Sequence, residues 1–312
     1  MFKKSKPAPA APTIGVAKSH IYGGEENKGG GAASKTAGDS ESMKEWVPDK
    51  RNDPYGYWRV VKQASAKQSK AKSLHDAVER VIDSVIHNIH AKPYLPPEYE
   101  KKQAPKFDLV SVDELQLICN AARVVCLKED TLMNVTPPCK VFGDIHGQIS
   151  DLIQFFSQYG APSHRIGDIN ICKYIFIGDF VDRGAYSLEV LLVLLCLKLR
   201  YHPHVIMLRG NHEEKMMNQQ FGFMEEIANR LGNTMGSKIY DDEIFPLFQA
   251  LPLAATIDEK ILCVHGGPGV HVETLEQIRK IKRPLTKPTF QMIPGKSEQN
   301  AIVDLMWADP TN

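Results

Sequence analysis

Apolar residues recur at the three- and four-residue spacing of a helix between positions 74 and 89, and they predict one buried helical face. Ser73 precedes this segment and Asp76 lies three positions later, so these two side chains are placed to cap its first turn. A second helix is predicted over LQLICNAARVVCLK, where Ser111 and Glu114 form another capping box. Both helices are expected to pack into a core.

From Cys139 onward, short apolar runs alternate with helical patterns. The runs CKVF, CKYIFIG and HVIMLRG predict strands, and the segments DLIQFFSQYG and SLEVLLVLLCLKLR predict the helices between them. The segment ATIDEKILCVHGG predicts two further strands that are joined by a turn at Asp258 and Glu259. Strands that alternate with helices predict the α/β class, with a sheet at the centre of the domain.

The formal net charge of +1 conceals an asymmetry along the chain. Residues 1–72 contain 14 Lys and Arg against 7 Asp and Glu, whereas the remainder contains 24 against 30. The first part is also rich in Gly, Ser, Ala and Lys, and it can bury too little apolar surface to offset the entropy lost on ordering. We therefore expect a basic, largely disordered extension over residues 1–72 and a folded domain over residues 73–312.

Composition argues against several classes of protein. No apolar stretch approaches 18 residues, which argues against a membrane span, and no apolar core follows the basic N-terminus as a secretory signal requires. The small net charge gives no reason to expect nucleic acid as a partner. The six cysteines include no CxxC pair, which favours a reduced compartment. A cytoplasmic or nuclear location is expected.

Polar side chains follow four of the predicted strands. They are Asp144 and His146, Asp179, Asn211, and His265. Ligands of open α/β sheets bind outside the carboxyl ends of the strands. Carboxylate, amide and imidazole groups without a thiolate suit divalent ions such as Mn²⁺, Fe²⁺ or Zn²⁺. The sequence therefore predicts a metal site at these strand ends.

Three further residues would complete a reaction at such a site. Arg183 is a natural bidentate partner for a phosphate, and His212, held by Asp182, would be a positioned proton donor. Two metal ions about 3.5–4 Å apart stabilise both the attacking and the leaving oxygen of an in-line displacement. Together these groups predict hydrolysis of a phosphoester.

The sequence resembles the metal-dependent phosphoprotein phosphatases, the serine/threonine phosphatase family that is related to protein phosphatase 1. The signatures that carry the resemblance are GDIHGQ at 143–148, GDFVDRG at 178–184 and LRGNHE at 208–213, followed by similar blocks at 252–267, 276–284 and 305–310. The resemblance covers roughly residues 74–312, and the spacer HRIGDINICKY is similar to that of the kelch-repeat-associated branch. It implies the calcineurin-like metallophosphoesterase fold, a β-sandwich flanked by helices.

The resemblance also implies roles for the metal ligands. Asp144, His146 and Asp179 would hold a first metal ion, and Asp179, Asn211 and His265 would hold a second. Manganese is the expected metal in vitro, with iron or zinc as alternatives. A hydroxide between the two ions would attack the phosphorus.

The same resemblance assigns the acid–base chemistry. His212, oriented by Asp182, would protonate the leaving serine or threonine oxygen, and Arg183 would hold the phosphate. Phosphoserine and phosphothreonine proteins would be the substrates, and regulatory or targeting subunits are expected partners.

Two departures from the family pattern are visible. The family has a further histidine ligand and a second phosphate-binding arginine after the ADP block, and this sequence stops at Asn312. We therefore expect the catalytic domain over residues 73–312 to lack the family's C-terminal segment. HGGPG at 265–269 stands where HGGLSP is more usual. Two alternative functions therefore stay open: a truncated, catalytically weak chain that binds partners, and a related phosphoesterase that acts on nucleotides.

Overall fold

The computed structural model describes residues 68–87, 89 and 107–310, all of which belong to the compact unit Glu45–Asn312. The extension predicted over residues 1–72 falls mostly outside these residues, and its disorder stays a prediction. The six cysteines are all free. Among the described residues, no helix has both the length and the apolar character that crossing a membrane requires.

The first described helix differs from the one predicted. Helix α2 spans Gln68–Val81 and continues as the π-helix η2, Ile82–His87. Ser73 therefore lies inside the helix and does not cap it, so this prediction is wrong. Four of the five residues in the preceding QSKAK are good helix formers, and Ala71 among them is 4% exposed in the core. Burial of Ala71 extends the helix towards the N-terminus.

The second predicted helix is confirmed with its cap. Helix α3 spans Val112–Lys128, and the Ser111 hydroxyl accepts a hydrogen bond from the Glu114 backbone N–H. The Glu114 carboxylate in turn accepts the Ser111 N–H at 2.8 Å. This reciprocal cap satisfies backbone donors that would otherwise have no partner at the start of the helix.

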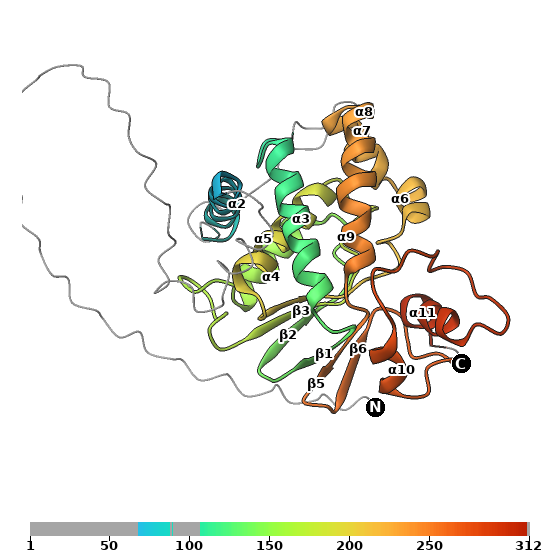
Figure 1. The fold of residues 1–312 in the computed structure, drawn as a ribbon. Coiled ribbons are helices and arrows are strands. Elements are labelled where there is room, and N and C mark those ends of the chain that lie inside the picture. Colours follow the sequence, from blue (N-terminus) through green and yellow to red (C-terminus); the bar gives the residue numbers. More distant parts are fainter. Residues whose placement is uncertain (1–67, 88, 90–106, 311–312) are drawn as a thin grey trace, which may run out of the picture. The chain divides into compact units, whose positions relative to one another are not determined.

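Two three-stranded sheets form the centre of the fold (Figure 1). The first has the order β2-β3-β4 and is entirely parallel; its strands are Cys139–Phe142, Lys173–Phe176 and Val205–Met207. The second has the order β1-β5-β6, with β1 parallel to β5 and β5 antiparallel to β6; its strands are Leu132–Val135, Ala254–Ile257 and Ile261–Val264. The predicted strands are thus present, whereas β1 is a strand that the sequence pattern did not indicate.

Alternating side chains pack the two sheets against each other. In β3, Ile175 belongs to one apolar cluster together with Ala255 and Ile257 of β5, whereas Tyr174 and Phe176 belong to the large cluster formed with the helices. Residues that alternate along a strand point to opposite faces of its sheet. The inner faces therefore form a sandwich, and the outer face of the first sheet is covered by helices.

Helices also cover the second sheet. A third apolar cluster joins Leu132 of β1 and Ala254 of β5 to Ile278, Ile302 and Leu305. The last three residues belong to the short helix α10, Leu275–Lys280, and to α11, Ser297–Trp307. The fold is therefore a β-sandwich with helices on both outer faces, as predicted.

The remaining helices lie between the strands along the chain. They are α4 Ile149–Tyr159, α5 Ser187–Tyr201, α6 Lys215–Phe221, α7 Phe223–Leu231, α8 Asn233–Ile239, η3 Tyr240–Ile244 and α9 Phe245–Ala250. Helix α5 contacts β4, whereas α7, α8 and α9 pack on other helices. Every residue of α5 is buried, which agrees with its nearly uninterrupted apolar sequence.

Candidate active site

The polar cluster lies where β2, β3 and β4 end. These strands are parallel and in register, so the loops that follow them leave from the same edge of the sheet. The loop after β2 is tied to the loop after β3, because the N–H groups of Ile145 and His146 both donate to the Asp179 carbonyl, at 3.0 and 2.9 Å. The backbone thereby fixes His146 beside Asp179.

Two glycines allow the next pair of loops to meet. A Cβ atom on Gly178 would lie 2.3 Å from the Gly210 nitrogen, and one on Gly210 would lie 2.3 Å from Asp179 Oδ1. Gly178 also has a φ of +106°, a conformation that disfavours other residues. Glycine at both positions is what brings the ends of β3 and β4 into contact.

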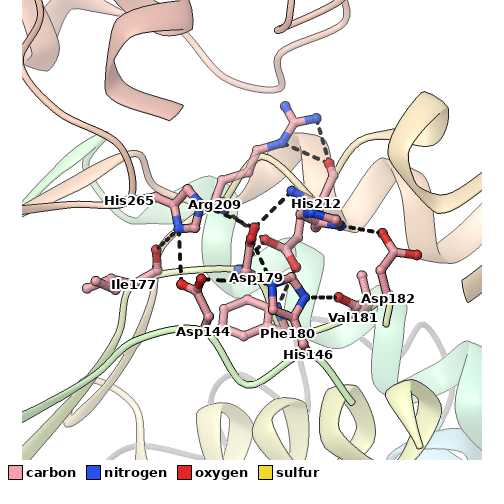
Figure 2. Close-up of polar contacts among 12 residues, drawn as sticks. Asp144, His146, Ile177, Asp179, Phe180, Val181, Asp182, Arg209, His212 and His265 are labelled. Carbon is pink, nitrogen blue, oxygen red and sulfur yellow. Dashed lines mark hydrogen bonds and ion pairs between the residues drawn. The ribbon is translucent and has the colours of Figure 1, made fainter. Parts of the chain in front are cut away.

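Asp179 is the centre of the cluster (Figure 2). Its Oδ2 lies 3.3 Å from His146 Nε2, and its Oδ1 lies 3.3 Å from His265 Nε2. Asp144, which is more exposed, has carboxylate oxygens 3.8 Å from His146 Nε2 and 3.9 Å from His265 Nδ1. One carboxylate thus lies between two imidazoles, with a second carboxylate beside both.

Backbone carbonyls set the orientation of the two imidazoles. His146 Nδ1 donates to the Val181 carbonyl at 2.8 Å, and His265 Nδ1 donates to the Ile177 carbonyl at 3.1 Å. The Nδ1 atoms must therefore carry protons, which leaves the Nε2 lone pairs directed into the cluster. A hydrogen bond of this kind on the other ring nitrogen is what fixes a metal-binding histidine in proteins.

Two buried polar atoms at the site make no well-formed hydrogen bond, although Asp179 lies near one of them, and both belong to predicted ligands. They are His146 Nε2 and Asn211 Oδ1. A buried polar atom without a partner is costly, so each such atom in a native structure calls for an explanation. A divalent cation satisfies both a lone pair on nitrogen and an amide oxygen, and the residues present therefore fit a metal ion.

Charges within the cluster shift two pKa values. Burial raises the pKa of Asp179, but His146, His265 and the His212 N–H together hold it below its ordinary value. Burial lowers the pKa of His146, whereas Asp179 and the Val181 carbonyl raise it, and the balance lies above the ordinary value. Asp179 is therefore held as a carboxylate, the form that binds a cation.

A second set of hydrogen bonds holds His212 beside this cluster. His212 Nδ1 lies 2.8 Å from Asp182 Oδ2, and both side chains are almost completely buried. The same Asp182 oxygen accepts a hydrogen bond from Asn218 Nδ2, and its other oxygen accepts the Phe223 N–H. Asp182 is thus fixed by three donors and directs His212 Nε2 towards the cluster.

Arg183 completes the arrangement. Its Nη2 lies 3.0 Å from His212 Nε2, and its backbone N–H donates to the Phe221 carbonyl. The Phe221 ring packs edge-on against the His212 ring, with centroids 5.1 Å apart. The guanidinium therefore lies beside the Nε2 atom of the His212 imidazole.

The loops at this site carry backbone strain. Among the described residues, six other than glycine have positive φ, and four of them are predicted site residues: His146, Asp179, Asp182 and Arg183. The other two are Asp258 and Glu259, in the turn predicted between β5 and β6. Side chains other than glycine adopt this conformation at a cost of about 1–3 kcal/mol each. Such strain is common where residues are held for function.

Seven of the eight predicted site residues follow β2, β3 or β4, and His265 reaches them from the end of β6 in the second sheet. Two sets of donor atoms, each within 4.8 Å, could hold an ion: His146, Asp179 and His212, and Asp144, Asp179 and His265. Asp179 is common to both sets, as the predicted bridging ligand requires. The sets group Asp144 with His265 and include His212, which differs from the predicted division. The individual roles stay predictions.

One residue that was not identified from the sequence is Glu213, whose carboxylate binds the backbone at Asp179. Glu213 is fully buried, and its carboxylate accepts the N–H groups of Asp179, Phe180 and Gly210, each at 2.8 Å. Burial and the Asp179 charge raise the pKa of Glu213 to about 7, against these three donors. The signal was present in the sequence, because Glu213 ends the LRGNHE motif.

Asn218 was missed as well, and it carried no motif that could have identified it. In addition to its bond to Asp182, its amide donates to the His212 carbonyl at 2.7 Å, and its oxygen accepts the Tyr240 hydroxyl at 2.7 Å. Asn218 therefore connects the histidine, the aspartate and η3.

Comparisons with known proteins agree with this geometry. Residues 138–312 match the calcineurin-like phosphoesterase family. The chain is 41% identical over 199 residues to serine/threonine-protein phosphatase BSL2 of Arabidopsis thaliana and 39% identical over 201 residues to serine/threonine-protein phosphatase PP1-delta of Caenorhabditis elegans. Each match covers 64% of this chain, which spans 19% of the first relative and 59% of the second.

A solved structure shows the same fold. It is a protein serine/threonine phosphatase from Saccharomyces cerevisiae with similarity to human phosphatase PP5, and it aligns with a TM-score of 0.56 at 25% identity. The alignment covers 76% of this chain and 65% of that one. The kelch-repeat-associated branch stays a prediction. On its matched residues, its relatives and its fold, the chain belongs to the calcineurin-like phosphoesterase family.

Proposed function

We propose that the chain is a protein serine/threonine phosphatase that uses two divalent metal ions. The observation that carries this proposal is the position of the His212–Asp182 pair and Arg183 directly beside a carboxylate shared by two histidines. The relatives named as serine/threonine-protein phosphatases support the choice of substrate.

The division of the ligands between the two ions is proposed from the family resemblance, and the geometry supports Asp179 as the shared ligand. Asp179 would bind both ions, His146 and Asp144 would bind the first, and Asn211 and His265 the second. Nε2 of His146 and Oδ1 of Asn211, which make no well-formed hydrogen bond, support these two residues as ligands. When bound, the ions would polarise the phosphoryl group and lower the pKa of water enough to supply a nucleophile at neutral pH.

The chain's own residues would supply the remaining steps. A phosphate at the centre would take the Arg183 guanidinium, which now contacts His212 Nε2, as a bidentate partner. That movement would leave Nε2 free to carry a proton to the leaving serine or threonine oxygen. Asp182 would hold the imidazole in the tautomer with a proton on Nδ1 and stabilise its charged form.

The proposal is tested by offering one preparation several substrates. In the presence of Mn²⁺, we expect release of phosphate from phosphoserine and phosphothreonine peptides, with much slower hydrolysis of a dinucleoside tetraphosphate. Arg183→Lys keeps the charge but loses the planar fork, and it should lower kcat/KM for the peptides. Faster turnover of the nucleotide than of every peptide would refute the assignment of substrate.

A further inference from the structure

The loop that begins with His265 lies against the C-terminal end of α11. The Gly266 N–H donates to the Leu305 carbonyl at 2.8 Å, and the Gly267 N–H donates to the Asp304 carbonyl at 3.3 Å. A Cβ atom on Gly266 would lie 2.7 Å from the Trp307 nitrogen, so the two backbones are in direct contact. Helix α11 therefore holds the first two residues after the histidine.

A buried carboxylate holds the other end of this loop. The Asp304 side chain is 4% exposed, and its Oδ2 accepts the His271 backbone N–H at 2.8 Å. The same oxygen lies 3.0 Å from His271 Nδ1. One oxygen atom thus binds both the main chain and the imidazole of a residue six positions after His265.

The departure HGGPG is explained by this carboxylate. Gly269 has a φ of +54°, and a Cβ atom at this position would lie 2.1 Å from Asp304 Cγ. The chain therefore crosses directly over Asp304, and only glycine leaves room for it. The more usual serine would displace the carboxylate from His271.

His265 depends on this support because of where it lies. It follows β6, which pairs only with β5 among the described strands, so its sheet holds it from one side. Its Nδ1 bond to Ile177 sets the ring orientation, and its Nε2 then reaches Asp179 Oδ1 at 3.3 Å. A shift of the loop would move Nε2 away from Asp179.

We propose that Asp304 and His271 form a latch that positions His265 for one divalent metal ion. Both are positioning residues, since neither reaches the cluster. The inference rests on the proposed two-metal function. It identifies the residues that control the affinity of one of the two metal sites. The latch sets how tightly the ion next to His265 is held.

The test measures binding of Mn²⁺ alone by isothermal titration calorimetry, with His271→Ala and Asp304→Asn. Loss of a group that is hydrogen-bonded to a metal ligand typically lowers metal affinity by about 10–100-fold. Because Asp304 and His271 act on His265 through the loop between them, we expect a loss near the lower end of this range for one of the two ions and an unchanged affinity for the other. Glu298→Gln is the matched control, because it removes a carboxylate from an exposed position on the same helix.

Thermal unfolding of the metal-free proteins separates positioning from folding. His271 is partly exposed, so His271→Ala should unfold within a few degrees of the parent and yet bind the ion more weakly. If Asp304→Asn does not fold, the Mn²⁺ affinity of His271→Ala alone tests the latch. Affinities for both ions that equal those of the parent in His271→Ala would overturn the latch.

The outcome also separates the latch from the proposed function. A parent that hydrolyses phosphopeptides, together with variants that bind Mn²⁺ normally, would refute the latch alone. Weakened binding in the variants of a parent that turns over no phosphopeptide would support the latch and refute the phosphatase proposal. A parent that binds no Mn²⁺ would refute both.

Discussion

Replacing Glu213 tests whether one buried carboxylate holds the turns that carry Asp179 and Asn211. Its oxygens accept three backbone N–H groups from the ends of β3 and β4. A hydrogen bond to a charged group contributes about 1.5–3 kcal/mol, and such contributions are not additive. We therefore expect Glu213→Ala, which leaves three buried donors without an acceptor, to lower the free energy of unfolding by on the order of 4–6 kcal/mol.

The amide variant should be milder. In Glu213→Gln, the remaining oxygen can still accept two of the N–H groups, while the amide NH₂ opposes the third. The expected loss is about 1–3 kcal/mol, the cost of one unsatisfied buried donor. Because the substitution also removes a negative charge beside Asp179, part of this loss is offset.

Urea unfolding followed by circular dichroism, at a pH above the Glu213 pKa of about 7 so that the carboxylate is charged, measures both losses, and metal content per chain reports on the site. Glu225→Ala and Glu225→Gln are matched controls, because Glu225 lies on α7 with an exposed side chain. We expect the free energy of unfolding to be lowest for Glu213→Ala, intermediate for Glu213→Gln and highest for the parent. The two variants at position 225 should show no comparable change. Equal stability of Glu213→Ala and Glu225→Ala would show that the three hydrogen bonds do not hold the turns.

Three further predictions concern the acid–base pair and a distant ion pair. His212→Ala should lower turnover of a phosphopeptide by about 10²–10⁴-fold, the usual contribution of a general acid, and a large loss of bound metal would instead identify His212 as a ligand. Asp182→Asn should lower turnover in the same direction, because the amide cannot stabilise a charged imidazole; normal turnover would contradict the assigned role. Glu129 is buried, which raises its pKa, but Lys198 and His202 outweigh burial and hold the pKa below its ordinary value. Its contribution to stability is therefore complete above about pH 4.5 and lost as the pH falls further, so the difference in unfolding free energy between parent and Glu129→Gln should shrink from pH 7 to pH 3.5. A difference that is independent of pH would contradict this reasoning.

Local patterns predicted much of the fold. The capping box at Ser111 and Glu114 depends on residues three positions apart, and the structure confirms it. The strand ends were found because short apolar runs stop at Gly-Asp, Gly-Asp and Gly-Asn. Strand β1 was not found, since its four residues pair with β5 more than a hundred positions later.

The start of α2 shows a different limit of sequence reasoning. Its first turns, QSKAK, continue a polar run whose composition is typical of disorder, and only packing of Ala71 in the core reveals them as helix. Tertiary burial outweighed composition at this position. The local sequence does not indicate which alanine will be buried against other elements of the fold.

The candidate site was predicted more completely than its support. Asp179, His212 and His265 belong to motifs, so their side chains could be named before any geometry was known. Glu213 and Asn218 act through hydrogen bonds to backbone groups and to other site residues, and these depend on loops that meet only in the folded chain. The latch at Asp304 is of the same kind, since it joins residues 33 positions apart.

The most direct test of the two-metal site measures bound metal and activity together. Metal-free protein is titrated with Mn²⁺, and bound ions per chain and release of phosphate from one phosphoserine peptide are recorded at each step. The account predicts that activity rises as occupancy approaches two ions, and that Asp179→Asn, which changes the carboxylate between both histidines, loses both binding and turnover. Full turnover after exhaustive chelation, or in Asp179→Asn, would contradict it.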